Sequence, residues 1–253
     1  MALPDFEAVA ARDGTRLAVH RMGEGTRGTV VLLHGLFSNV ETNWVKFGHA
    51  QKLVDAGFAL IMPDLRAHGH SGAPHDPACY PPDVLVRDLE DVIAHYGLVE
   101  YDLVGFSLGS RTVLRGVLDG LEPRRLVLTG MGLEGLAGWE KRAEFFRDAI
   151  DRFNEVRMGD PAFFAVSFMK TMKVDRTAAR LLLGSMADTS PDALSAATMP
   201  TLVLCGDKDN DNGSADALAD ALPDGRRATI PGTHMSSVSE GALGDELVAF
   251  LTA

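Results

Sequence analysis

Short apolar runs alternate with amphipathic stretches along most of the chain. The first two runs, at 6–10 and 16–21, flank the turn-forming pair Asp13-Gly14 and predict a β-hairpin. Further runs of β-branched and other apolar residues predict strands at 29–33, 58–62, 101–104, 125–129, 201–205 and 227–230. Apolar residues at helical spacing predict helices at 43–56, 82–96, from the glycines at 105–109 to about residue 118, and at 239–251. Gly57 is expected to cap the first of these helices.

Apolar strands that alternate with amphipathic helices are typical of a parallel sheet covered on both faces. The predicted fold class is therefore α/β, with a mostly parallel central sheet of about eight strands and helices on both faces. One stretch differs, because residues 133–197 contain no clear strand, only helix-like segments rich in Phe and Met. We interpret 133–197 as a helical lid, or cap, inserted after strand six, and 1–132 with 198–253 as the core domain.

Composition and charge narrow the classes of partner. With 253 residues and 46% hydrophobic positions, the chain is long enough to bury one substantial core. Its formal net charge is −11, and the densest basic patches are only the pairs 124–125 and 226–227. Since nucleic acids and anionic lipid surfaces attract clusters of Lys and Arg, we expect neither as a partner.

The sequence shows no targeting signal, and its two cysteines do not narrow the fold or the function further. No stretch approaches the roughly 18 apolar residues of a membrane span, and the N-terminus lacks the basic and apolar regions of a secretory signal. A cytoplasmic location is therefore expected. Cys79 and Cys205 are the two cysteines, and nothing in a chain of this size requires a disulfide between them. The oligomeric state cannot be predicted.

The segment Gly105-Phe106-Ser107-Leu108-Gly109 follows a predicted strand and opens a predicted helix. This is the context of a nucleophile elbow, in which a sharp turn projects a serine hydroxyl toward a base. The turn strains the serine and crowds the positions two before and two after it, where glycine relieves the crowding. The N–H of Leu108, at the helix start, points to where an oxyanion would form. Ser107 is thus the candidate nucleophile.

Acyl transfer needs a second N–H donor, a base and an acid. The turn after the strand at 29–33 offers the N–H of Leu36, with Phe37 as the alternative, while His34 is interpreted as holding this loop. His234 is the candidate base, because it lies in a loop after the last strand, where α/β folds gather their chemistry.

The acid is expected after the strand at 201–205, where three aspartates compete. All three satisfy the chain order serine, acid, histidine; Asp209 is preferred, followed by Asp211 and then Asp207. The same run imitates a calcium loop, but Asn212 stands where glycine is required and Leu218 where glutamate is required. His68 and His70 flank Gly69, but no third ligand joins them at a recognisable spacing. We therefore expect no metal and no cofactor.

Five motifs in order resemble the α/β-hydrolase superfamily, in its branch of small lid-bearing serine esterases of the carboxylesterase type. They are LLHGLF at 32–37, PDLRAHGHS at 63–71, GFSLG at 105–109, GDKD at 206–209 and PGTH at 231–234. The resemblance implies a nucleophile at Ser107, a base at His234, an acid at Asp209 and an oxyanion hole formed by Leu36 and Leu108. It also implies a structural role for Asp64 and Arg66. Ala67 departs from the glycine that is usual in this motif, and only a local effect is expected.

The resemblance and the serine together predict an enzyme that hydrolyses carboxylic esters through an acyl-enzyme intermediate. Leu36, Phe37, Phe106 and Met235 flank the chemistry as candidate substrate-binding residues, and they favour a small to medium ester as the small-molecule substrate. The sequence leaves open a carbon–carbon bond hydrolase or a lactonase with the same triad. It also leaves open a small-molecule receptor that turns over slowly.

Overall fold

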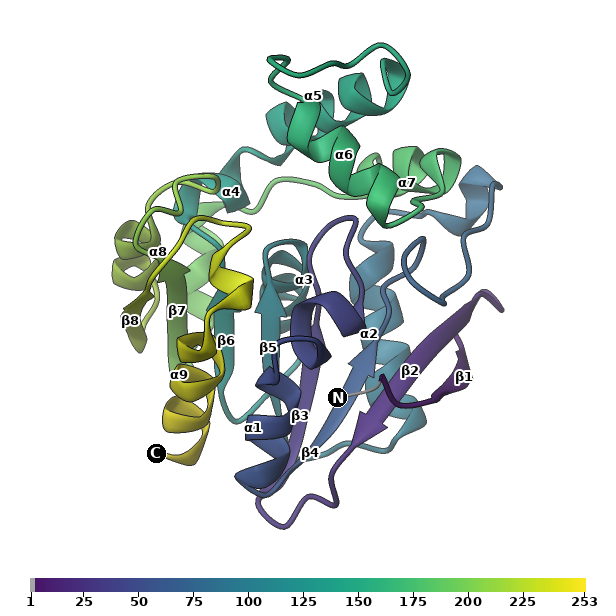
Figure 1. Ribbon diagram of the computed structural model, residues 1–253. Helices are drawn as coiled ribbons and strands as arrows, with labels where there is room; N and C mark the ends of the chain where they lie inside the picture. The colour runs from purple at the N-terminus through teal and green to yellow at the C-terminus, as the bar shows by residue number, and fades with distance from the viewer. Residues whose placement is uncertain (1–2) are drawn as a thin grey trace.

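The computed structural model describes residues 3–253, which form an eight-stranded sheet in the order β1-β2-β4-β3-β5-β6-β7-β8 (Figure 1). The strands are β1 (Phe6–Ala10), β2 (Arg16–Met22), β3 (Gly28–Leu33), β4 (Phe58–Pro63), β5 (Tyr101–Phe106), β6 (Leu126–Thr129), β7 (Thr201–Gly206) and β8 (Gly225–Ile230). The pairs β1–β2 and β2–β4 are antiparallel, and all the other neighbours are parallel. The predicted hairpin and the mostly parallel sheet are therefore confirmed.

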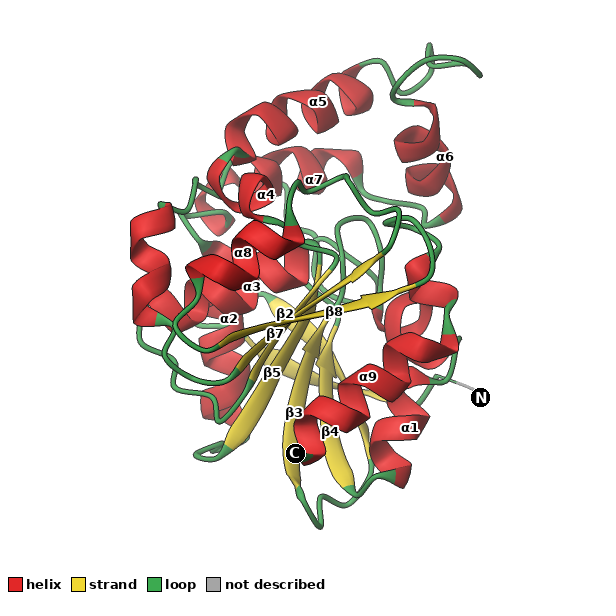
Figure 2. Ribbon diagram, turned by 90° about the vertical axis from the view of Figure 1, so that its left-hand side faces the viewer, coloured by secondary structure: helices red, strands yellow, loops and turns green. Residues whose placement is uncertain are grey.

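Helices cover both faces of this sheet (Figure 2). They are α1 (His49–Asp55), α2 (Val84–His95), α3 (Leu108–Leu118), α4 (Leu133–Ala137), α5 (Trp139–Asp151), α6 (Phe163–Thr171), α7 (Arg176–Leu183), α8 (Ala215–Ala221) and α9 (Gly241–Thr252). Helices α1 and α9 pack together on one face, and α2, α3 and α8 lie on the other. Alternate side chains of a strand serve the two layers: Val31 and Leu33 belong to one apolar cluster, and Val30 and Leu32 to the other.

Helices α4 to α7 all fall between β6 and β7. Figure 1 shows α5, α6 and α7 beyond the ends at which β3 and β5 finish, above the body of the protein. A short 3-10 helix, Pro191–Ala196, completes this stretch before the chain returns to the sheet. Residues 133–197, called the helical segment below, thus contain helices and no strand. No helix among residues 3–253 combines the length and apolar character needed to cross a membrane.

Two local expectations need correction. The helix expected over 43–56 is divided into a π-helical turn, Glu41–Val45, and α1, because Gly48 between them adopts a left-handed conformation with φ 82°. Helix α8 was not predicted; the Ser214 hydroxyl caps it by accepting the N–H of Ala217. Gly57 has φ 96° after the end of α1, as its predicted capping role requires.

Candidate active site

Ser107 stands on the turn between β5 and α3, in the strained conformation φ 52°, ψ −107°. Its N–H donates to the carbonyl oxygen of Thr129 at 2.8 Å, which fixes the turn against β6. A Cβ at Gly105 would lie 2.3 Å from the main chain of Gly109, and a Cβ at Gly109 would lie 2.2 Å from the carbonyl oxygen of Leu33. The turn can therefore form only with glycine at both positions.

His234 follows β8 and reaches back to this serine. Its Nε2 lies 3.1 Å from the Ser107 Oγ, and its Nδ1 lies 3.0 Å from the Oδ2 of Asp209. The ring of Phe106 packs on the imidazole, with 5.1 Å between the ring centroids. A carboxylate can only accept a hydrogen bond from Nδ1–H, so this arrangement leaves Nε2 free to accept the serine proton.

The three aspartates after β7 lie in different surroundings. Asp209 has a buried side chain facing His234, and its Oδ1 accepts the N–H of Asp211 at 3.1 Å. Asp207 instead accepts the N–H of Gly232, in the loop that leads to the histidine. Asp211 is exposed, and its carbonyl oxygen accepts a hydrogen bond from Arg142 of α5. Of the three carboxylates, that of Asp209 is the one bonded to His234.

Electrostatics keep the Asp209 carboxyl charged. Burial alone would raise its pKa, but the hydrogen bond and the charge of His234, with a smaller effect of Arg142, outweigh burial and lower the pKa below its ordinary value. An ionised carboxylate next to Nδ1 stabilises the imidazolium that forms when Nε2 takes a proton.

The loop after β3, residues 34–40, carries the two candidates for the second oxyanion donor, Leu36 and Phe37. The N–H of Phe37 is taken, because it donates to the Nε2 of His68 at 2.9 Å. Among residues 3–253, no intramolecular acceptor takes the N–H of Leu36 or of Leu108. Burial, and then the neighbouring His34, lower the pKa of His68 to about 3, so its ring stays neutral and can accept. This bonding favours Leu36 over Phe37 as an oxyanion donor.

Buried polar groups brace the same loop. His34 donates from Nδ1 to the carbonyl oxygen of Gly35 and accepts the N–H of Leu65 on Nε2, as expected of a loop-holding residue. Asp64 accepts the N–H of Val40 at 2.9 Å. Arg66 pairs with two carboxylates beneath the loop, at 2.5 and 2.7 Å.

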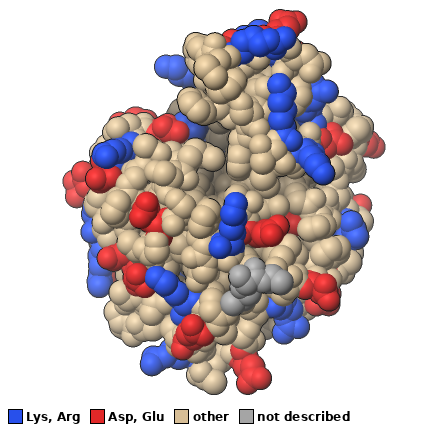
Figure 3. Space-filling view, in the orientation of Figure 1, with Lys and Arg blue, Asp and Glu red and all other residues tan. Residues whose placement is uncertain are grey.

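The apolar candidates differ in exposure. Phe37 and Phe106 are buried, Leu36 is half-buried, and Met235 is 54% exposed. Phe37 meets Phe146 of α5 edge to face, with 5.5 Å between ring centroids, so the 34–40 loop touches the helical segment. In Figure 3 the surface is indented between the helical segment and the body of the protein.

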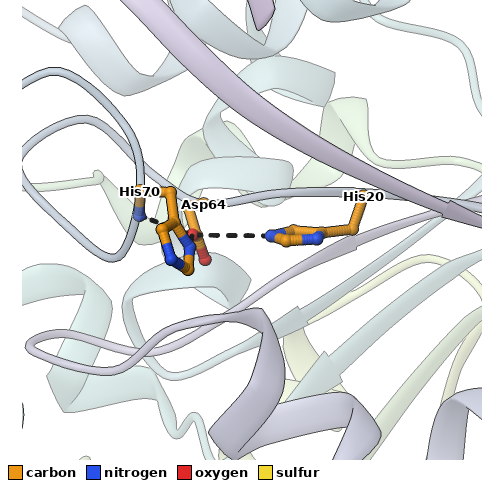
Figure 4. A group of neighbouring side chains, drawn as sticks. All are labelled: His20, Asp64 and His70. Carbon is orange, nitrogen blue, oxygen red and sulfur yellow. Dashed lines mark hydrogen bonds and ion pairs between the residues drawn. The ribbon is translucent and has the colours of Figure 1, made fainter. Parts of the chain in front are cut away.

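One polar cluster went unpredicted. The fold brings His20 of β2 and Asp64 next to His70, at no spacing that the sequence marks (Figure 4). Sequence spacing gave no signal for this, since His20 lies far from the other two residues along the chain.

Comparisons with known proteins point to the same fold. Residues 28–125 match the model of the alpha/beta hydrolase fold family. Over 215 residues, covering 76% of this chain and 82% of the relative, the sequence is 26% identical to a 2-succinyl-6-hydroxy-2,4-cyclohexadiene-1-carboxylate synthase of Salmonella paratyphi C. A hydrolase from Pseudomonas aeruginosa PA01 superimposes with a TM-score of 0.76 at 21% identity, over 98% of both chains. An esterase from Exiguobacterium antarcticum gives 0.75 at 20% identity, over 98% of this chain and all of that one.

Proposed function

Residues 28–125 match the alpha/beta hydrolase fold family, and we propose that the chain is a serine hydrolase of the α/β-hydrolase superfamily that cleaves carboxylic esters through an acyl-enzyme intermediate. One observation carries the proposal: the hydrogen-bonded series from Ser107 Oγ to His234 Nε2, at 3.1 Å, and from His234 Nδ1 to Asp209 Oδ2, at 3.0 Å. A serine, a base and an orienting acid in this order form the general device for activating a hydroxyl.

In the first half-reaction, Nε2 of His234 takes the proton of the Ser107 hydroxyl as Oγ attacks the ester carbonyl carbon. The oxyanion of the tetrahedral intermediate would receive hydrogen bonds from the free N–H groups of Leu36 and Leu108. The proton then passes from Nε2 to the departing alkoxide, which leaves as the alcohol, and the acyl group stays on Oγ.

In the second half-reaction, water attacks the acyl carbon while Nε2 takes one of its protons. Collapse of the second intermediate returns that proton to Ser107 Oγ and releases the carboxylic acid. Asp209, charged throughout, holds the ring in the tautomer that both halves require. The cycle consumes one water and one ester, needs no cofactor, and gives one acid and one alcohol.

The proposed substrates are small to medium monoesters. Buried Phe106 packs on His234, and buried Phe37 and half-buried Leu36 lie in the 34–40 loop. In this proposal these bulky side chains limit the length of the acyl chain. In this proposal the helical segment is a lid, because Phe146 contacts Phe37 in the loop that carries the candidate oxyanion donor Leu36. A cytoplasmic location stays part of the proposal.

The direct test is turnover of p-nitrophenyl acetate, butyrate and octanoate by the wild type, Ser107→Ala and His234→Ala. Sustained turnover that both substitutions abolish, with a maximum at the shorter chains, is the expected result. Activity that survives in Ser107→Ala would remove the proposed nucleophile, and a rate that rises to the longest chain would remove the proposed substrate size. A single burst without turnover would support a receptor.

The match to the synthase favours a second candidate, a reaction with the same triad that forms a carboxylate-bearing cyclic compound. Arg142 of α5 offers a cation above the acid loop, where it donates to the carbonyl oxygen of Asp211. Such a guanidinium could pair with a substrate carboxylate. Formation of a carboxylate-bearing cyclohexadiene that requires both Ser107 and Arg142, in a protein without ester turnover, would favour this candidate.

A further inference from the structure

Three ligand-type atoms outside the triad converge where β2 lies beside the carboxyl end of β4. They are Nε2 of His20, Oδ2 of Asp64 and Nδ1 of His70, and all lie within 4.8 Å of one another. Nε2 of His20 is 3.7 Å from the carboxylate oxygen, and Nδ1 of His70 is 3.4 Å from it. Figure 4 shows His20 pointing at the carboxylate from one side and the His70 ring from the other.

His20 is bonded on one side only. Its Nδ1 lies 2.7 Å from the carbonyl oxygen of Pro4, which can only accept, so the proton of a neutral ring belongs on Nδ1. That leaves the lone pair of Nε2 directed at Asp64. The side chain is about 1% exposed, and Nε2 has no hydrogen-bond partner among residues 3–253. Either a proton or a metal ion can lie between this buried nitrogen and the carboxylate. Burial disfavours the charged ring, but the Asp64 carboxylate outweighs burial and raises the pKa of His20, so a proton on Nε2 is the competitor of a metal ion here.

We propose that His20, Asp64 and His70 bind a divalent transition-metal ion of the zinc class. Two imidazole nitrogens and one carboxylate oxygen suit zinc, and three protein ligands leave one position for water. In a tetrahedral site with bonds of about 2.0–2.1 Å, ligand atoms stand roughly 3.3–3.4 Å apart. The two separations from the carboxylate oxygen, 3.4 and 3.7 Å, approach that value. The two histidine nitrogens lie within 4.8 Å of each other, so the rings would rotate toward each other to complete the site.

The surroundings of the three ligands support metal binding. The Pro4 carbonyl orients His20 through its distal nitrogen, which is how metal-bound histidines are usually held. The ring of Phe6 stacks on His70, with 5.1 Å between centroids, and limits its rotation. Asp64 accepts the N–H of Val40 on Oδ1 and the N–H of His70 on Oδ2, which leaves one lone pair of Oδ2 for an ion. About half of the His70 side chain is exposed, so a metal ion and its water can enter from solvent.

The position of the proposed metal site determines which segments a bound ion would hold together. A bound ion would link β2 to the loop after β4 and, through Asp64, to the 34–40 loop. Because the ligands come together only in the folded chain, binding would stabilise the folded state. The site does not depend on the proposed hydrolase activity, so each proposal can fail alone.

The test is titration of metal-free, untagged protein with zinc chloride, followed by calorimetry and thermal unfolding. We expect one zinc per chain and a Tm that rises by roughly 5–10 °C at free zinc about a hundredfold above Kd. Cobalt(II) should give the visible absorption of a four-coordinate ion. His70→Ala should weaken zinc binding tenfold or more, to judge by the roughly 10–100-fold cost of losing even an outer-shell partner.

The chain provides a matched control in His95, which also lies 3.4 Å from a carboxylate and is similarly exposed, but lacks a third ligand. His95→Ala should bind zinc as the wild type does. His234→Ala, which removes the triad histidine, should also keep the response. Failure of the wild type to bind zinc at millimolar concentration would overturn the proposal. So would equal binding by His70→Ala and the wild type, or equal losses in the His70 and His95 variants.

Discussion

Replacing Asp209 by Asn tests the proposed triad most sharply, because the structure predicts which nitrogen of His234 will carry the proton. The carboxylate uses its Oδ1 to accept the N–H of Asp211 and its Oδ2 to face Nδ1 of the histidine. An asparagine has only one acceptor oxygen. If that oxygen stays with the Asp211 N–H, the amide NH2 group faces Nδ1.

Nδ1 must then accept a hydrogen bond, which moves the ring proton to Nε2, opposite Ser107. In this tautomer Nε2 cannot take the serine proton. Loss of the correct tautomer in a serine triad lowers kcat by about 10⁴. We expect kcat/KM for a short p-nitrophenyl ester to fall by roughly 10³–10⁴, or about 4–5.5 kcal/mol of transition-state stabilisation.

Asp211→Asn and Asp207→Asn are matched controls, since both remove one charge from the same loop. Asp211 is exposed and acts through its main chain, and asparagine at 207 keeps an oxygen for the Gly232 N–H. Both variants should stay within about threefold of wild type, as surface substitutions usually do. Circular dichroism and Tm would check that all three variants fold. A larger loss in Asp211→Asn than in Asp209→Asn would refute the assignment.

Three further substitutions test the stability of the fold and the contact between the helical segment and the 34–40 loop. The hydrogen bond from Arg66 lowers the pKa of Asp13 to about 2, so this carboxylate stabilises the fold above its unfolded pKa of about 4, and the stability is lost as pH falls toward 2. The free-energy advantage of the wild type over Asp13→Asn, about 1 kcal/mol after allowing for exposure, should therefore shrink between about pH 5 and about pH 2 in urea titrations. Gly109→Ala should lower the free energy of unfolding by about 3 kcal/mol or prevent folding, because the new Cβ meets a main-chain oxygen at 2.2 Å; a Tm within a degree of wild type would contradict this. Phe146→Ala should lower kcat/KM by roughly 2–10-fold through its lost contact with the 34–40 loop, whereas Phe164→Ala, at an 81% exposed position of the same segment, should have no effect; equal losses would exclude the contact.

Local patterns predicted most elements because each strand is a short apolar run bounded by turn residues. The predicted and observed bounds differ only slightly: β5 continues to Phe106 where the prediction ends at residue 104, and β8 begins at Gly225 where the prediction begins at residue 227. The helix over 43–56 failed because apolar spacing does not register a single left-handed glycine, here Gly48. Ala67 is a second position whose left-handed conformation the apolar pattern does not register. It adopts φ 66°, which explains why glycine is usual there. Apart from the motif, nothing in the sequence marks the position as left-handed.

The sequence predicted the cluster of Ser107, Asp209 and His234 but not the cluster around His20, and the reason is the topology of the sheet. Ser107, Asp209 and His234 each follow a parallel strand, and β5, β6, β7 and β8 are neighbours in the sheet. The carboxyl ends of parallel neighbours meet at one edge, so chain order alone suggests that these residues converge. His20 instead lies within β2, which runs antiparallel to β4 with Val19 opposite Pro63. That register brings His20 beside the carboxyl end of β4 and hence beside Asp64. Sequence spacing does not reveal this register, because the register of two strands distant in sequence is set by the packing of both against the core.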